Sequence, residues 1–231
     1  MLVSQRPEAL LLLADGTVFR GRAIGARGIS TGEICFNTGM TGYQEIFTDP
    51  SYTGQIMVMA SPHIGNYGVK DGEEESAAIT IAGLVVKKYS DVWSRPGGTG
   101  PLDDALKAAG VAGISDIDTR KLVRHIRDRG AQNALISSTE ADLGVLKALL
   151  AKAPDMAGRE LSSTVSTPAP YTLGPADAPH RVALVDFGVK RNIERCLLER
   201  RCLVRVFPMT TSLKEMLDFR PNGFLLSNGP G

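Results

Sequence analysis

The last 51 residues follow a pattern that few folds satisfy. Three short apolar runs, Arg181–Phe187, Cys202–Phe207 and Phe224–Leu226, alternate with two amphipathic segments, Lys190–Arg201 and Leu213–Phe219. Apolar runs bounded by turn residues predict buried strands, and apolar residues three or four positions apart predict helices. The resulting order, strand-helix-strand-helix-strand, is typical of a parallel sheet with helices on both faces. We therefore predict α/β structure here, the first βαβαβ part of a doubly wound sheet.

A tight turn, Ser227–Gly231, follows the third predicted strand. Glycine frees φ and Pro230 fixes it, so the strand cannot continue through this turn. Open parallel sheets bind ligands beside the carboxyl ends of their strands. The backbone N–H groups of Gly229 and Gly231 are the donors that we expect to point outward, and two such donors can hold a carboxylate or a developing oxyanion. No Gly-x-Gly-x-x-Gly follows the first strand, so a dinucleotide site is not expected.

The first 155 residues mix strands and helices at irregular intervals, which is typical of an α+β domain. The predicted strands are Ala9–Leu13, Thr17–Gly21, Glu33–Asn37, Gln55–Ala60, Ala77–Lys87, Val111–Ser115 and Gln132–Ser137. The predicted helices are Leu102–Ala109, Thr119–Arg129 and Asp142–Lys152. Residues 156–180 are predicted to form a Pro-rich linker that holds no regular element from Ser162 to His180. We thus predict domains at 1–155 and 181–231, joined by that linker.

Two features of the first domain are candidates for binding. Asn37–Tyr52 combines small polar residues with aromatic ones and is predicted to be a long irregular loop, a kind of segment that often carries function. The helix Thr119–Arg129 is basic everywhere except along one apolar stripe. Such a face is usually only solvated, but it could also dock an acidic partner surface.

Composition excludes several function classes. The formal net charge of +1 gives no global argument for nucleic-acid or membrane binding, and no apolar run approaches the ~18 residues of a membrane span. Three cysteines without Cys-x-x-Cys spacing argue against a disulfide framework or a zinc site, so no metal is expected and the cytoplasm is the expected location. Cys35 lies in an apparent core strand and is rejected as a nucleophile.

Several strings of the chain are specific when they occur together and in order. They are Phe36–Glu45, Thr48–Tyr52, Pro62–Asn66, Asp116–Leu122, Gly130–Asn133, Asp186–Ile193 and Leu226–Gly231. In this order they resemble the small, glutamine-using subunit of carbamoyl phosphate synthetase, along nearly the whole chain. The resemblance implies a swivelling β/β/α-type N-terminal domain, followed by the start of a class I glutamine amidotransferase domain.

The resemblance also implies a function. The family's small subunit hydrolyses L-glutamine with a Cys–His–Glu triad. It passes ammonia to a large synthetase subunit, which makes carbamoyl phosphate from bicarbonate and ATP for pyrimidine and arginine synthesis. This implies a large-subunit partner, no nucleic-acid or membrane partner, and no cofactor bound by this chain itself.

Three site residues carry over from the family. Ser51 resembles a serine that contacts bound glutamine, and Gly229 and Gly231 match the glycines of the glutamine and oxyanion loop. No catalytic residue carries over, because the family's nucleophile lies in a Gly-x-Cys-x-Gly elbow beyond this loop, and the triad is expected beyond residue 231. We therefore expect an amidotransferase domain that is incomplete in these 231 residues, and no glutaminase activity from them alone.

Two other readings remain open. The chain could act as a non-catalytic module that docks on the large subunit through its first domain, by the basic helix or by the loop Asn37–Tyr52. Alternatively it could be a component of anthranilate or GMP synthetase, which share the Asn-Gly-Pro-Gly loop. Those proteins lack the long first domain, which makes this reading the weaker one.

Overall fold

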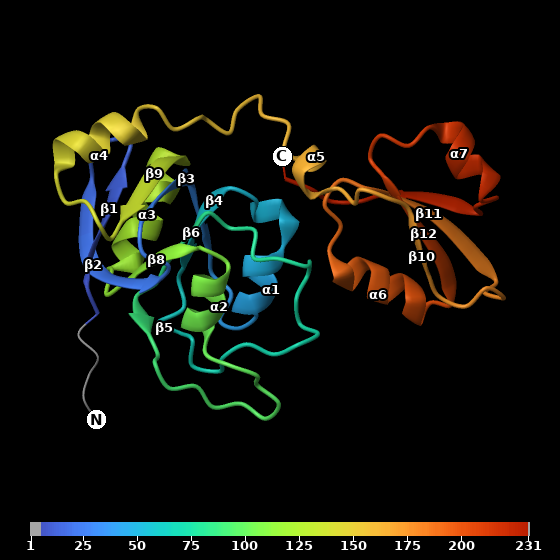
Figure 1. Ribbon diagram of the computed structural model, residues 1–231, viewed down its shortest axis with the longest axis horizontal. Coiled ribbons are helices and arrows are strands. Elements are labelled where there is room, and N and C mark those ends of the chain that lie inside the picture. The colour runs from blue at the N-terminus through green and yellow to red at the C-terminus, as the bar shows by residue number, and fades with distance from the viewer. Residues whose placement is uncertain (1–5, 231) are drawn as a thin grey trace. The chain divides into compact units, whose positions relative to one another are not determined.

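The computed structural model of the protein describes residues 6–230, which fall into two compact units (Figure 1). The first unit consists of Met1–Phe47, Gly54–Glu73 and Ala78–Gly158. The second consists of Thr48–Thr53, Glu74–Ala77 and Arg159–Gly231. Two short segments from the N-terminal half of the chain are therefore part of the second unit.

A closed seven-stranded barrel forms the body of the first unit. Its strands are β1 (Glu8–Leu13), β2 (Val18–Gly25), β3 (Ile29–Asn37), β4 (Gln55–Met59), β6 (Gly83–Val85), β8 (Ala112–Ser115) and β9 (Gln132–Ser137). They follow one another in the order β1-β2-β8-β6-β4-β3-β9, and the pairs β3/β4, β4/β6 and β6/β8 are parallel. Closure pairs every strand on both sides, so this sheet exposes no free edge. A separate small parallel sheet pairs β5 (His63–Ile64) with β7 (Lys88–Tyr89).

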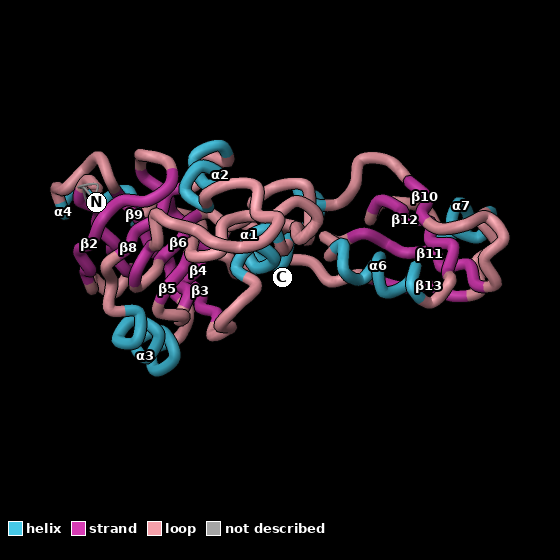
Figure 2. Tube along the Cα trace, turned by 90° about the horizontal axis from the view of Figure 1, so that it is seen from below, coloured by secondary structure: helices cyan, strands magenta, loops and turns pink. Residues whose placement is uncertain are grey.

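Helices cover the barrel at several places. They are α1 (Tyr43–Thr48), α2 (Leu102–Ala108), α3 (Thr119–Arg129) and α4 (Leu143–Leu150), and a 3-10 turn spans Pro50–Tyr52. Figure 2 shows α2 and α3 on opposite sides of the barrel strands. The α3 residues Leu122 and Ile126 join the main barrel core, whereas Leu146 and Leu150 of α4 pack on a second cluster with Leu10, Leu12 and Leu135.

The second unit contains a four-stranded sheet with the order β10-β12-β11-β13. Its strands are β10 (Tyr171–Leu173), β11 (His180–Asp186), β12 (Cys202–Pro208) and β13 (Gly223–Leu226). The strand β11 runs parallel to both β12 and β13. The helices α6 (Arg191–Glu199) and α7 (Leu213–Asp218) pack on separate clusters, one for each face of the sheet (Figure 1). The predicted βαβαβ order is confirmed.

The bounds predicted for the helix Thr119–Arg129 are confirmed, whereas α2, α4, α6 and α7 are each one to three residues shorter than predicted. Asp118 caps α3 by accepting a hydrogen bond from the N–H of Lys121 at 3.0 Å, and Gly130, with φ +91°, ends the helix. Ser212 and Glu215 form a capping box at the start of α7. Local side chains determine these ends, which is why they can be read from the sequence.

The prediction of an irregular loop at Asn37–Tyr52 is wrong, because α1 and the 3-10 turn lie inside it. Tertiary contacts order this stretch. The Tyr43 side chain is buried, its hydroxyl donates to the carbonyl of Gly68 at 2.6 Å, and its ring stacks on Tyr67. These partners lie more than 20 positions away, so the local sequence does not indicate the helix.

The predicted linker is also corrected, because the stretch Ser162–His180 contains regular elements. A short helix α5 (Ser162–Val165) and the edge strand β10 lie within it, and His180 begins β11. Three residues of extended chain become a strand here only because β12 offers them an antiparallel partner. In the same way, only Gly83–Val85 of the predicted strand Ala77–Lys87 pairs with neighbours.

The mixed α/β architecture agrees with the predicted fold class. The closure of the first sheet into a barrel was not predicted, because strand order cannot be read from element spacing. The domain boundaries at residues 155 and 180 stay a prediction.

Candidate functional site

The turn after β13 packs on the turn after β11, within the second unit. The N–H of Ser227 donates to the carbonyl of Val185 at 3.1 Å, and its hydroxyl oxygen accepts from the N–H of Phe187 at 2.9 Å. The Ser227 hydroxyl also donates to the carbonyl of Asn228 at 2.6 Å. These bonds fix the two turns against each other at the carboxyl ends of two neighbouring parallel strands, where such sheets bind ligands.

The carboxylate of Asp186 shapes the turn after β11. It is buried and accepts hydrogen bonds from the N–H groups of Gly188 and Val189, both at 2.8 Å, and from that of Thr167 at 2.7 Å. A buried carboxylate needs this number of donors to offset the loss of water. Asp186 is therefore a structural group in this turn.

Two glycines are required by close packing. A Cβ on Gly229 would lie 2.0 Å from the carbonyl oxygen of Phe187, so no larger residue fits without moving the backbone. Gly188 has φ +116°, and a Cβ there would lie 2.8 Å from Val165 and 3.1 Å from Pro50. The predicted site residue Gly229 therefore has a packing requirement as well as a candidate donor role.

The donor argument for Gly229 rests on its backbone N–H. Gly229 is partly exposed, and within residues 6–230 its N–H donates to no protein acceptor. An unpaired amide N–H at the carboxyl end of a parallel strand can donate to a ligand anion. Gly231, the second predicted donor, lies outside the described residues.

Ser51 lies beside this turn, in the short segment that belongs to the second unit. Its hydroxyl oxygen accepts a hydrogen bond from the side-chain amide of Asn228 at 2.9 Å. Its own N–H donates to the Asp49 carboxylate at 2.9 Å, which caps the 3-10 turn. Ser51 thus contacts the turn that contains Gly229, through Asn228, although 177 positions separate Ser51 from Asn228.

Asn228 connects three parts of the site. Besides Ser51, its amide donates to the carbonyl of Gly188 at 3.1 Å, and its oxygen accepts from the N–H of Lys190 at 3.3 Å. The side chain thereby joins the turn after β13, the turn after β11 and the Ser51 segment. In the sequence Asn228 is only one residue of a turn motif, and its spacing gives no sign of this bridging role.

Lys190 adds a positive charge near Ser51. Its Nζ lies 2.7 Å from the buried Asp49 carboxylate. Partial burial alone would lower the pKa of Lys190, but the hydrogen bond and the charge of Asp49 outweigh burial and raise the pKa above its usual value. This ion pair was not predicted, and the sequence signal for it is slight, because the Asp49-Pro50 pair indicates only a turn.

The second short segment holds the start of α6. The N–H groups of Arg191 and Asn192 donate to the backbone oxygen and the carboxylate of Glu75, both at 2.9 Å. The N–H of Glu75 in turn donates to the hydroxyl oxygen of Thr48 at 2.8 Å. Lys190, the local N-cap residue, supplies no side-chain cap, so Glu75 replaces it.

Each of the three cysteines lies in a strand or a helix and not in this turn. Burial, followed by the charge of Glu33, raises the pKa of the Cys35 thiol to about 12, which keeps it protonated near neutral pH. Cys202 is buried in β12, and Cys196 lies on α6. The rejection of Cys35 as a nucleophile agrees with this environment.

Among the residues that the structure describes, no group of three or more His, Cys, Asp or Glu side chains could hold a metal ion. Over the same residues, no helix is both long and apolar enough to cross a membrane.

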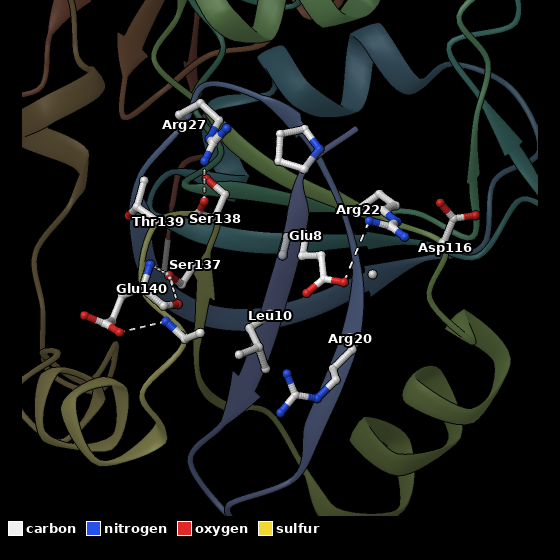
Figure 3. Close-up of a pocket in the computed structure, with 14 residues that line it drawn as sticks. Glu8, Leu10, Arg20, Arg22, Arg27, Asp116, Ser137, Ser138, Thr139 and Glu140 are labelled. Atoms are coloured by element: carbon white, nitrogen blue, oxygen red, sulfur yellow. Dashed lines mark hydrogen bonds and ion pairs between the residues drawn. The ribbon is translucent and has the colours of Figure 1, made fainter. Parts of the chain in front are cut away.

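A surface pocket of about 510 Å³ lies on the first unit, beside β1, β2 and the turn after β9 (Figure 3). Three arginines, Arg20, Arg22 and Arg27, contribute to its wall. Several of its polar groups are already engaged, since Arg27 donates to the carbonyl of Ser138 at 2.8 Å. None of the predicted site residues lines it.

Comparison with known families agrees with the geometry at the turn. The model of the class-I glutamine amidotransferases matches residues 183–231, which include Asn228 and Gly229. The model of the carbamoyl-phosphate synthase small chain, CPSase domain, matches residues 11–136, more than half of the chain. The chain therefore belongs to the carbamoyl-phosphate synthase small chain family.

Individual relatives support the same assignment. A carbamoyl phosphate synthase small chain of Chlorobaculum tepidum is 48% identical over 227 residues, which cover 98% of this chain and 62% of that protein. The protein of the same name from Syntrophotalea carbinolica is 47% identical over 97% of this chain and 63% of its own length. A third, from Vibrio cholerae, is 45% identical over 97% of this chain and 63% of its own length. The chain thus spans less than two thirds of the length of these relatives.

Proposed function

We propose that this chain is part of the glutamine-hydrolysing subunit of carbamoyl phosphate synthetase. In this role it would help to supply ammonia to a large subunit, which makes carbamoyl phosphate from bicarbonate and ATP for pyrimidine and arginine synthesis in the cytoplasm. The names of the relatives support this family role. The observation that carries the proposal is the contact of 2.9 Å that brings Ser51 to the Asn228-Gly229 turn.

The proposed roles at the site follow from its donors. The Ser51 hydroxyl can both donate to and accept from the head group of an amino acid. The N–H groups of Gly229 and Gly231 would hold a carboxylate or the oxyanion that develops at the amide carbon of glutamine. ATP and bicarbonate would be used by the large subunit, and this chain would bind no cofactor.

The catalytic chemistry is proposed to lie outside these residues. None of the three cysteines has the flanking glycines of a Gly-x-Cys-x-Gly elbow, so no Cys–His–Glu triad is assigned. We also propose that the first domain is of the swivelling β/β/α type and that residues 181–231 begin the amidotransferase sheet.

Titration of the ¹⁵N-labelled chain with L-glutamine, followed by NMR, tests the site. We expect amide shifts at Ser51, Gly229 and Gly231 with L-glutamine but not with D-glutamine. Ser51→Ala should weaken binding by about tenfold, because a hydrogen bond to a charged group contributes about 1.5 kcal/mol. Ser94→Ala, an exposed serine of the first unit, is the control and should change nothing. Shifts spread over other residues, or none at all, would refute the proposed site.

The ammonia released from L-glutamine by the purified chain tests the assignment of catalysis. We expect no release above background. A rate that a thiol-alkylating reagent abolishes would contradict the statement that these residues contain no nucleophile.

A further inference from the structure

One face of α3 carries a row of arginines that point to solvent. Arg120, Arg124 and Arg127 are spaced by four and three positions, so they share one face of the helix and span about 10 Å along it. All three side chains are exposed. The opposite side of α3 packs into the barrel core through Leu122 and Ile126, which fixes the direction of the row.

The row borders a groove of about 510 Å³ within the first unit. Lys87, between β6 and β7, adds a fourth cation to its rim. Its remaining lining includes the less polar residues Ala60, Pro62 and Val123. The groove therefore has a cationic rim and a partly apolar floor.

The cations of this rim are largely unneutralised by the chain. Among the described residues, Lys87, Arg120 and Arg124 form no ion pair, and Arg127 contacts only its exposed neighbour Asp128, at 3.0 Å. The nearby carboxylates are used elsewhere, since Asp118 caps α3 and Asp116 pairs with Lys88. Unpaired like charges at this spacing repel one another, and an anionic partner removes that cost.

We propose that this groove, which we call the α3 groove, binds an acidic segment of a partner protein. Carboxylates three and four positions apart on a partner helix match the arginine spacing, and guanidinium groups bind carboxylates with two parallel hydrogen bonds. Aliphatic side chains of the same segment fill the floor formed by Ala60, Pro62 and Val123. This proposal extends the proposed function, because it assigns the surface that meets the large subunit.

A nucleic-acid ligand fits the groove less well. The formal net charge of the whole chain is only +1, so the chain as a whole does not attract a polyanion strongly. A phosphate backbone would also leave the floor without an apolar contact. The combination of guanidinium groups above a less polar floor is typical of protein interfaces, in which arginine is enriched.

Fluorescence anisotropy of a labelled peptide of about 15 glutamates, at about 50 mM salt where screening is weak, provides the test. The complete 231-residue chain should bind this peptide. The double variant Arg120→Glu/Arg124→Glu should bind it at least about tenfold more weakly, because two attractive contacts become repulsive. The matched control Arg20→Glu/Lys152→Glu makes the same charge change at two exposed cations outside the groove and should bind like the unmodified chain.

Competition separates this inference from the proposed partner. If the large chain of carbamoyl phosphate synthetase displaces the peptide, the result supports both the acidic-segment site in the α3 groove and the large chain as its partner. If the peptide binds through Arg120 and Arg124 but the large chain does not displace it, the groove stands and the proposed partner is wrong. Equal loss in both double variants, no binding of the peptide, or tighter binding of single-stranded DNA of the same length would overturn the acidic-segment assignment.

Discussion

At the scale of single residues, Asn228 contributes more to the site than its position in a turn suggests. Turn asparagines commonly hydrogen-bond only their own backbone. Here the side chain reaches Ser51, Gly188 and Lys190 at 2.9, 3.1 and 3.3 Å. It therefore orients the Ser51 hydroxyl and holds the neighbouring turn at the same time, which makes it a positioning residue.

Replacing Asn228 with alanine should lower the free energy of unfolding of the second unit by about 1–3 kcal/mol, because partly buried partners lose their hydrogen bonds. Chemical denaturation of the full chain, followed by amide signals of β11 and β13, measures this loss. Asn192→Ala on α6 is the control, since the Asn192 side chain is exposed and only its backbone N–H is used. A variant at Asn228 as stable as the control would show that the three contacts contribute little.

At the scale of elements, the helix α6 depends on a residue far away in sequence. Its first N–H groups are bound by Glu75, which precedes Asn192 by 117 positions. The other helix of the second unit, α7, carries its own capping box in Ser212 and Glu215. The two helices therefore differ in how their first N–H groups are capped. Residues of α7 itself and its N-cap residue cap α7, whereas the distant Glu75 caps α6.

Replacing Glu75 with alanine should expose the first turn of α6. We expect faster hydrogen exchange at Asn192, whose N–H loses the carboxylate, and a loss of about 1–2 kcal/mol in stability, the usual cost of losing an N-cap. The N–H of Arg191 donates to the backbone oxygen of Glu75, which the variant retains, so its exchange should change less. Glu75→Gln should retain part of the protection, because an amide oxygen still accepts a hydrogen bond. Glu199→Ala, at the exposed end of the same helix, serves as the matched control. Unchanged exchange in Glu75→Ala would contradict the capping role.

At the scale of the whole molecule, the second unit is discontinuous in sequence. Thr48–Thr53 and Glu74–Ala77 belong to it although more than 80 residues of the first unit separate them from Arg159. The first segment supplies Ser51 and Asp49, and the second supplies the cap of α6. A division of the chain at one linker therefore leaves the second unit without several of its own contacts.

Residues 159–231 expressed alone should consequently fail to unfold cooperatively on heating. They lack Ser51 (the partner of Asn228), Asp49 (the partner of Lys190) and Glu75 (the cap of α6). Together these losses approach the free energy of unfolding of a small unit, which is only a few kcal/mol. Residues 1–158, which contain the complete barrel, are the comparison and should show a cooperative transition by circular dichroism. A sharp transition in residues 159–231 would show that the two short segments are dispensable for folding.

Elements with local causes could be predicted from the residues that form them. The β1–β2 hairpin follows from Asp15-Gly16, where Gly16 adopts φ +87° and Asp15 accepts from the N–H of Thr17 at 2.9 Å. The helix α3 follows from its apolar stripe and from Asp118, and the βαβαβ order follows from the alternation of apolar runs. The family resemblance also indicated Ser51 and Gly229 as site residues, although not the contact between Ser51 and Asn228.

Features that depend on partners distant in sequence could not be predicted from local patterns. Barrel closure, the helix α1 and the edge strand β10 each form because a remote strand or side chain receives their hydrogen-bonding or apolar groups. The meeting of Ser51 with Asn228 and the capping of α6 by Glu75 are of the same kind. Local patterns fix where a chain turns and which face is apolar, but hydrogen bonds between segments more than a hundred residues apart become visible only once the chain has folded.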